Sequence, residues 1–97
     1  MRIKPGEKNI IVSTVKAQDN SADVYLYGSR ADDQLKGGDI DLLILSDRLQ
    51  FSDKVTLLIN LKEQMGDQKI DLLIKGKRES EVDPFVQQIL MSAIKLT

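Results

Sequence analysis

The sequence predicts a small α/β domain in which helices flank a mixed β-sheet. Its 97 residues form a single domain, 1–97, and leave no room for a second one. Short apolar runs alternate with segments of helical periodicity in the order α-β-α-β-α-β-α. The long helical link between the second and third strands favours a parallel pair, and the short link between the first and second is compatible with an antiparallel pair.

The first helix is expected to open at Pro5 and Gly6 and to run to about Gln18. Proline suits a first helical turn because its missing N–H has no helical partner there. Ile11 and Val15 stand four residues apart, so they share one face of this helix.

The first strand is expected over Val24–Tyr27, where apolar and aromatic residues gather before Gly28. The segment Ser29–Lys36 is compatible with one or two helical turns, and Gly37-Gly38 is typical of a turn. The second strand is then expected over Asp39–Leu45.

The next helix is predicted over roughly 53–65, with Ser52 as its cap and Gly66 as its stop. Its apolar stripe is predicted to contain Val55, Leu58, Leu61 and Met65. A third strand over Lys69–Ile74 and a charged loop over 76–82 follow.

A last helix is predicted to begin at Asp83-Pro84, a cap followed by a first turn. Its apolar face is predicted to contain Phe85, Val86, Ile89, Leu90, Ala93 and Ile94. This face either packs on the domain's own sheet, which is the commoner arrangement, or offers Phe85, Ile89, Ala93 and Ile94 to a partner.

The composition excludes several kinds of catalysis. The chain contains no histidine and no cysteine, so it has no imidazole base, no thiolate nucleophile, no disulfide and no thiolate zinc site. Any ion bound by its side chains must sit on oxygen ligands, which suits Mg²⁺, Mn²⁺ or Ca²⁺.

Charge and hydropathy limit the partners. Fourteen basic and fifteen acidic residues leave a formal net charge of −1, which argues against a polynucleotide as the main ligand. The longest apolar runs have four residues, at 24–27 and 42–45, so no membrane span is expected. The first eight residues do not resemble a signal peptide, and a cytoplasmic location is the default expectation.

Carboxylates open two of the predicted strands. Asp39 and Asp41 are two residues apart and project from the same face of their strand, and Asp71 lies at the start of the third strand. If these strands are neighbours, three carboxylates converge and form a site for two divalent ions. The alternatives are solvated strand ends and a structural Ca²⁺ site.

The turn after the first strand is a candidate phosphate site. Backbone N–H groups at Gly28 and Ser29 can face a phosphate, and the serine hydroxyl adds a donor. The alternative is that Ser29 caps a short helix with Asp32 as its capping-box partner. Arg30 either contacts phosphate or forms an ordinary surface ion pair.

Taken together, these motifs resemble the signature of the DNA polymerase β nucleotidyltransferase superfamily. Gly28-Ser29 is followed by nine residues, then Asp39-Ile40-Asp41-Leu42, then Asp71 about thirty residues later. The stretch 26–42 is similar to the minimal nucleotidyltransferase (MNT) branch, small prokaryotic proteins commonly partnered with HEPN-domain proteins. The resemblance covers about residues 10–75.

The resemblance implies a polymerase β-like fold and a metal-dependent enzyme. Gly28 and Ser29, with Arg30, would hold the triphosphate. Asp39 and Asp41 would bind two Mg²⁺ ions, or Mn²⁺, and Asp71 would be the third carboxylate ligand and the base. The implied reaction transfers AMP from ATP to a hydroxyl of a HEPN partner, as the antitoxin of a toxin–antitoxin pair.

Two departures from the family pattern concern the loop after Gly28-Ser29. Its nine residues compare with ten in many members, and it carries Asp33 and Gly38 where many members have Gly and Ser. The acidic residues Asp32 and Asp33 would repel a phosphate. The alternatives to the antitoxin enzyme are a non-catalytic module that inhibits its partner by contact and a small-molecule nucleotidyltransferase. A homo- or hetero-oligomer is compatible with each.

Overall fold

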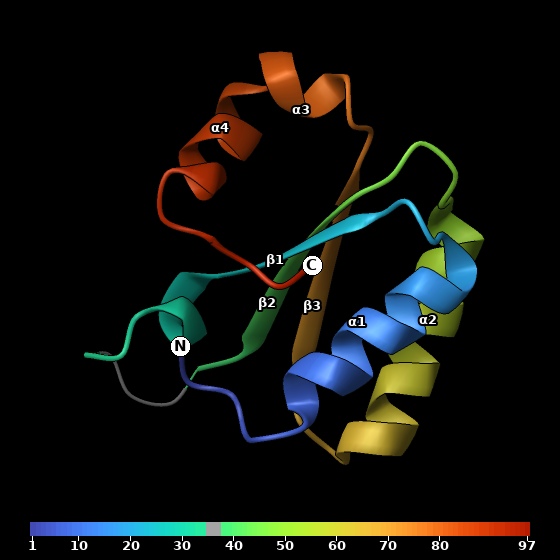
Figure 1. Ribbon diagram of the computed structural model, residues 1–97, viewed down its shortest axis with the longest axis vertical. Coiled ribbons are helices and arrows are strands. Elements are labelled where there is room, and N and C mark those ends of the chain that lie inside the picture. The colour runs from blue at the N-terminus through green and yellow to red at the C-terminus, as the bar shows by residue number, and fades with distance from the viewer. Residues whose placement is uncertain (35–37) are drawn as a thin grey trace.

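A computed structural model describes residues 1–34 and 38–97 of the chain (Figure 1). These residues form a mixed four-stranded sheet with helices on both faces. In chain order the elements are α1 (Glu7–Gln18), β1 (Asp23–Tyr27), the 3-10 helix η1 (Gly28–Ala31), β2 (Ile40–Leu45), α2 (Phe51–Met65), β3 (Ile70–Lys75), α3 (Glu79–Val82), α4 (Pro84–Leu90) and β4 (Ile94–Lys95).

The strand directions agree with the prediction from connection length. The strands lie in the order β3-β2-β1-β4. β1 and β2 are antiparallel, whereas β2 and β3, joined through α2, are parallel. The α+β fold predicted from the sequence is therefore confirmed, with one additional strand.

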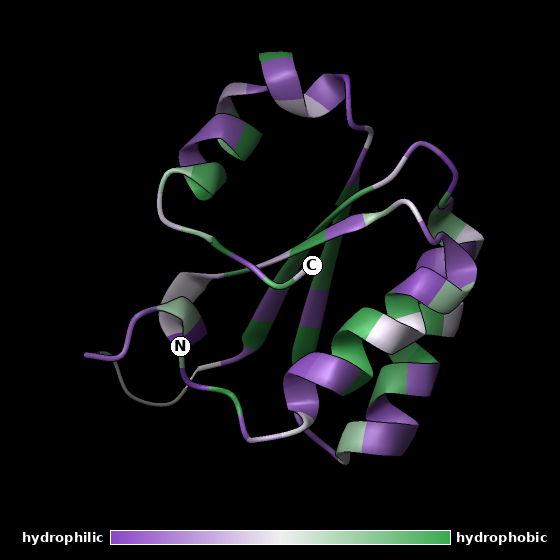
Figure 2. Cartoon of the chain, viewed as in Figure 1, coloured by the Kyte–Doolittle hydropathy of each residue, from purple (hydrophilic) through white to green (hydrophobic). Residues whose placement is uncertain are grey.

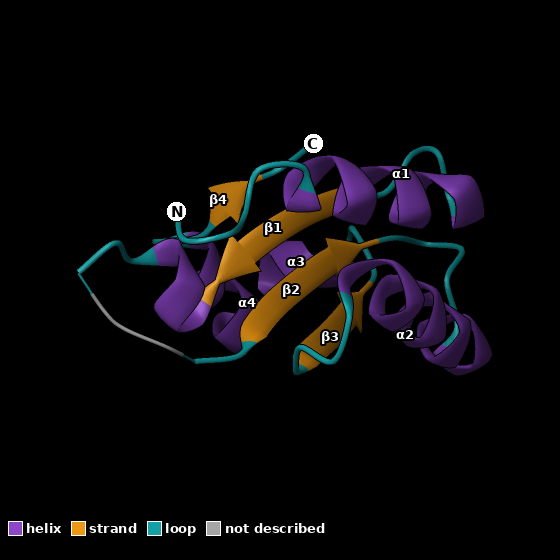
Figure 3. Ribbon diagram, turned by 90° about the horizontal axis from the view of Figure 1, so that it is seen from below, coloured by secondary structure: helices purple, strands orange, loops and turns teal. Residues whose placement is uncertain are grey.

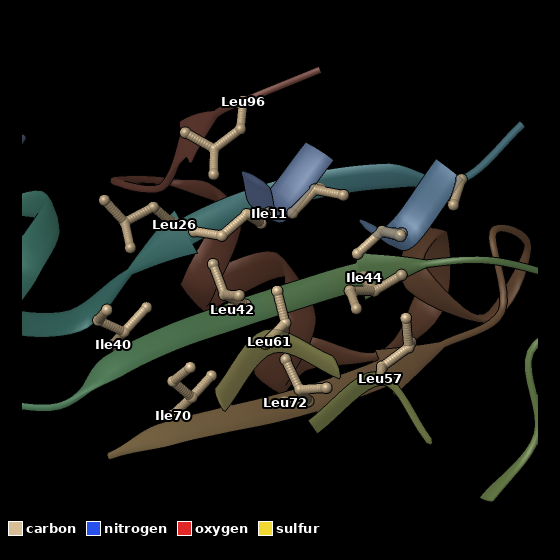
Figure 4. Close-up of a cluster of buried hydrophobic side chains, with 13 residues drawn as sticks. Ile11, Leu26, Ile40, Leu42, Ile44, Leu57, Leu61, Ile70, Leu72 and Leu96 are labelled. Carbon is tan, nitrogen blue, oxygen red and sulfur yellow. The ribbon is translucent and has the colours of Figure 1, made fainter. Parts of the chain in front are cut away.

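Each face of the sheet buries its own apolar cluster. On one face the even-numbered residues Ile40, Leu42 and Ile44 of β2 pack beneath α1 and α2, against residues such as Ile11 and Leu61 (Figures 1 and 4). On the other face Leu43 and Leu45 pack against α4. Because both faces are covered, β2 reads as a nearly continuous apolar run after Asp41. Figure 2 shows hydrophobic residues along the strands.

The C-terminal segment differs from the prediction. The last helix ends at Leu90, and Ile94 lies in β4, where it pairs with Leu26 of β1. The Leu96 N–H also donates to the Val24 carbonyl at 2.8 Å. Helical periodicity did not reveal this strand because β4 has only two residues and a strand that short has no pattern of its own.

The last helix packs on the domain's own sheet. Val86 and Ile89 are buried against Leu43 and Leu45, so Ile89 is not available to a partner. Phe85 is 60% exposed and does not belong to this packed face. The predicted cap is confirmed, since the Asp83 carboxylate accepts from the Phe85 N–H at 2.9 Å. The charged loop predicted before it contains the short helix α3.

Helix α2 starts two residues earlier than predicted, and the face that it buries differs from the predicted apolar stripe. Gln50, not Ser52, is the cap, in a capping box with Asp53. Leu57 and Leu61 are fully buried, whereas Val55 of the predicted stripe is 44% exposed. The helix has apolar residues on more than one face, so periodicity alone did not select the buried one. None of the helices in residues 1–34 and 38–97 is long and apolar enough to cross a membrane.

A buried carboxylate ties the end of α1 to the loop after β2. Asp19 is 2% exposed and accepts hydrogen bonds from the hydroxyls of Ser46, at 2.5 Å, and Ser21, at 2.8 Å. The Ser46 oxygen in turn accepts from the Arg48 and Leu49 N–H groups at 3.1 Å. The hydrogen bond from Ser46 lowers the pKa of Asp19 below its usual value, although burial opposes it.

Replacing Asp19 by alanine is expected to lower the free energy of unfolding by about 2–3 kcal/mol, because buried donors lose a charged acceptor. The folded-state pKa of Asp19 is depressed, so its contribution is present above the unfolded-state value and is lost as the pH falls through the folded-state pKa. Denaturant unfolding of the wild type and of Asp19→Ala should therefore show a difference in the free energy of unfolding at neutral pH. This gap should narrow below about pH 4. A gap that is the same at every pH would contradict this explanation.

Candidate active site

The parallel pairing of β2 and β3 brings two of the predicted carboxylates together. Asp41 and Asp71 are register partners at the start of these strands, and Tyr27, at the end of β1, is the partner of Asp41 on its other side. By strand alternation the three side chains share the face that carries Leu43, under α4. The sheet thus places a phenol and two carboxylates in one row at one end.

The two carboxyl groups are in contact. The pKa of Asp41 is raised first by burial, then by the negative charges of Asp71 and Asp39, and then by the hydrogen bond that a protonated Asp41 can form with Asp71. The pKa of Tyr27 is also raised, first by burial and then by the charges of Asp41 and Asp71. The end of the sheet therefore concentrates negative charge that a cation or a proton relieves.

Asp39 does not join this pair directly. It lies just before β2, and its Oδ2 is 3.5 Å from the ammonium of Lys69. Over the described ranges, no three acidic side chains are arranged as ligands of one metal ion. Three carboxylates were predicted to converge. Asp41 and Asp71 do so, whereas Asp39 lies beside the exposed Lys69.

Gly28 brings the backbone up to the carboxylates. It has a φ of +73°, and a Cβ at this position would collide with the Asp41 carboxylate. Glycine is required here both for the left-handed conformation and for the close approach. The first strand therefore ends directly against Asp41, as a phosphate-binding turn beside these acids requires.

A second glycine, Gly38, fits against Ser29. Its φ is +88°, and a Cβ on it would overlap the Ser29 hydroxyl. From the sequence, Gly38 was predicted only as part of a turn. The glycine pair at 37–38 was a signal for a tight backbone, but its contact with Ser29 depends on the tertiary fold.

The Ser29 hydroxyl does not cap a helix. Among the described residues between β1 and β2, helical geometry covers Gly28–Ala31 alone, as a 3-10 turn with no side-chain cap. The Asp32 carboxylate accepts from the Gln34 N–H at 2.9 Å instead of closing a capping box. The rest of the expected helix, 35–36, and Gly37 of the expected turn lie outside the described residues.

Arg30 braces the loop. Its guanidinium donates to the Gly38 carbonyl at 3.2 Å and to the Arg2 carbonyl at 3.0 Å. Arg2 donates its N–H to the Arg30 carbonyl at 2.7 Å and its guanidinium to the Ser29 carbonyl at 2.8 Å. Sequence reasoning missed Arg2, because nothing in the pattern of residues 1–6 signals a contact with this turn.

A hollow of about 490 Å³ opens beside Gly28. It is lined by Gly28, Ala31, Asp32, Asp33, Gln34 and Ser92. This volume is in the range of small-molecule sites. Ser92, which follows α4, was not predicted as a site residue, since only the fold of the C-terminal segment brings it here.

Comparison with known proteins adds one match. The model of a family described as "Polymerase beta, Nucleotidyltransferase" matches residues 9–97. No curated protein matches the chain.

Proposed function

The chain belongs to the polymerase beta nucleotidyltransferase family, and on that premise we propose that it transfers AMP from ATP to a hydroxyl group of a partner protein. The family implies a nucleoside triphosphate as substrate. The observation that carries the proposal for this chain is the contact between Asp41 and Asp71, in register on parallel strands, beside the glycine turn at Gly28.

The donor set fits divalent magnesium. Asp41 and Asp71 offer neighbouring carboxylates whose charges repel each other, and Asp39 lies two residues away, with the exposed Lys69 as its ion-pair partner among the described residues. All the ligands are oxygens, as a hard cation prefers. We assign Asp39, Asp41 and Asp71 as ligands of two Mg²⁺ ions, which Mn²⁺ can replace. Such ions neutralise charge on the phosphates and on the attacking oxygen.

The turn at Gly28 would bind the triphosphate. Its backbone faces the carboxylates without an intervening side chain, so phosphate oxygens can approach its N–H groups closely. The Ser29 hydroxyl adds a donor. The hollow beside Gly28 offers room for the uncharged part of the nucleotide, since Asp32 and Asp33 in its lining would repel phosphate. Arg30 serves this turn by holding Gly38 in place.

In the proposed reaction the acceptor oxygen attacks the α-phosphorus of ATP. A new P–O bond forms to the acceptor, and the bond from the α-phosphorus to the bridging oxygen of pyrophosphate breaks. The acceptor's proton passes to the carboxylate of Asp71, which is exposed at the start of β3. Asp71 is the better base candidate, because Asp41 is less accessible and lies against Gly28.

The acceptor is proposed to be a HEPN-domain protein whose tyrosine is adenylylated, with this chain as the antitoxin. The resemblance of Gly28-Ser29 and Asp39-x-Asp41 to the MNT branch supports the same partner.

The test is to incubate the chain with a HEPN protein, MgCl₂ and α-labelled ATP. The proposal predicts label on a tyrosine of the partner and none with the double variant Asp39→Asn, Asp41→Asn. If that variant stays folded and still neutralises the partner's toxicity in cells, inhibition by contact alone replaces the antitoxin enzyme. Circular dichroism of the variant provides the folding control.

Arg30→Lys is expected to reduce kcat about as much as Arg30→Gln, by about tenfold. The guanidinium reaches two carbonyls at once, those of Gly38 and Arg2, and an ammonium keeps the charge but not this fork. Transfer rates at saturating ATP test the expectation. Full activity of the lysine variant would show instead that Arg30 acts by its charge on the phosphates.

A further inference from the structure

Strand β3 is an edge of the sheet with unused backbone groups. The Ile40 N–H donates to the Lys69 carbonyl and the Ser46 N–H to the Lys75 carbonyl, so the odd-numbered residues of β3 direct their backbone groups toward β2. The N–H and C=O groups of Ile70, Leu72 and Ile74 therefore face away from β2. Within the described part of the chain, β3 pairs with no other strand.

A pocket lies at the C-terminal half of this edge, between β3 and the start of α2. We call it the edge pocket; its volume is about 250 Å³. Its lining includes the apolar side chains of Phe51, Leu73 and Ile74 and the lysines Lys54 and Lys75. No acidic residue lines it, so its charged groups are both positive.

The two lysines are available to an anion to different degrees. Lys75 lies 3.6 Å from the Asp83 carboxylate, and both side chains are about three-quarters buried. Lys54 forms no ion pair in the described ranges. Lys54 is therefore the group best placed to attract a carboxylate.

Exposed apolar residues continue from the edge pocket along α2. Phe51, Val55 and Ile59 are spaced four residues apart and are 78%, 44% and 53% exposed. Figure 3 shows β3 as the outer strand of the sheet, with α2 beside it. An apolar stripe beside an unpaired strand is a combination that soluble proteins usually cover or charge.

We propose that β3 and the edge pocket form a docking site for an extended acidic segment of a partner protein. The segment adds as a strand to β3 and bonds to the outward groups of Ile70, Leu72 and Ile74. An apolar side chain fills the edge pocket, and a neighbouring carboxylate pairs with Lys54. This binding requires no nucleotide, so it stands apart from the proposed transfer reaction.

The test is a titration of the ¹⁵N-labelled full chain with a peptide of alternating valine and glutamate, about six residues long, the usual length of a strand. The expected result is a set of shifts and slower exchange at the amides of Ile70, Leu72 and Ile74. A peptide with lysine in place of glutamate should bind about fivefold more weakly, the effect of one favourable exposed charge pair.

Matched variants locate the contact. Lys54→Glu should weaken binding of the glutamate peptide about fivefold, whereas Lys62→Glu, on the same helix, should not. Phe51→Ala should also weaken it, whereas Met91→Ala, at a residue 80% exposed, should not. These residues are exposed or half-buried, so the fold should survive each change.

Three outcomes would overturn the proposal. They are the absence of any change at the three amides up to millimolar peptide, equal binding of the lysine peptide, and protection of those amides that rises with protein concentration alone. The last result would identify a second copy of this chain as the occupant. Because no ATP or Mg²⁺ is present, none of these outcomes bears on nucleotide transfer.

Discussion

Asp41→Asn is expected to lower kcat for nucleotide transfer by about a thousandfold, or roughly 4 kcal/mol of transition-state stabilisation. Asp41 touches Asp71 and lies against Gly28, so its charge acts where the proposed ligands and the phosphate-binding turn meet. Asparagine keeps the size of the side chain and removes the charge. Single-turnover transfer from α-labelled ATP measures the effect.

The same variant is expected to be more stable than the wild type at neutral pH without metal. Burial and the nearby negative charges raise the folded-state pKa of Asp41, so wild-type stability falls as the pH rises through that raised value. The neutral amide removes this loss. Lower activity with higher stability separates a catalytic role from a folding defect.

Asp67→Asn is the matched control, because Asp67 is an exposed aspartate just before β3. It should leave both kcat and the equilibrium constant of unfolding within about a factor of two of the wild-type values. If Asp41→Asn keeps wild-type kcat, Asp41 has no part in the reaction and the assignment of the site is wrong.

Gly28→Ala is expected to lower stability by about 2–4 kcal/mol and kcat about a hundredfold. About 1 kcal/mol comes from the left-handed backbone at a φ of +73°. The rest comes from the new methyl group, which must displace the Asp41 carboxylate or move the turn. Either shift separates the phosphate-binding backbone from the acids.

Gly66→Ala isolates the backbone part of this effect. Gly66 has a φ of +83°, but a Cβ there meets nothing within 4 Å. With a ψ of −163° it lies in a region that almost only glycine occupies, so alanine should cost about 1–3 kcal/mol of stability and leave kcat unchanged. Equal losses of activity in the two variants would show that the contact between Gly28 and Asp41 is unimportant.

The sequence predicted the sheet well because its signals are local. Apolar runs ending at Gly28 and beginning after Asp39 identified β1 and β2, and connection lengths predicted their directions. The parallel pairing that puts Asp41 beside Asp71 followed from the long helix between their strands. The two-residue strand β4 was missed, because its strand character comes only from pairing with β1.

The acidic residues and the glycine of the site could be predicted from the sequence, but the residues that hold them in position could not. Asp41, Asp71 and Gly28 belong to a spaced pattern that a reader of the sequence can recognise. The hydrogen bond from Arg2 to the Ser29 carbonyl and the contact between Ser29 and Gly38 join segments that are separated along the chain. No local sequence signal marks such contacts. The pairing of Asp39 with Lys69 depends on how two strand ends meet.

We propose that Asp41 and Asp71 make this chain a nucleotidyltransferase that modifies a protein hydroxyl. The most direct measurement compares α-labelled with γ-labelled ATP, each incubated with the chain, MgCl₂ and a HEPN partner. We expect that the α-label becomes covalently attached to the partner, that the γ-label leaves as pyrophosphate, and that neither occurs with Asp41→Asn. Transfer of the γ-label, or α-labelling that survives Asp41→Asn, would contradict it.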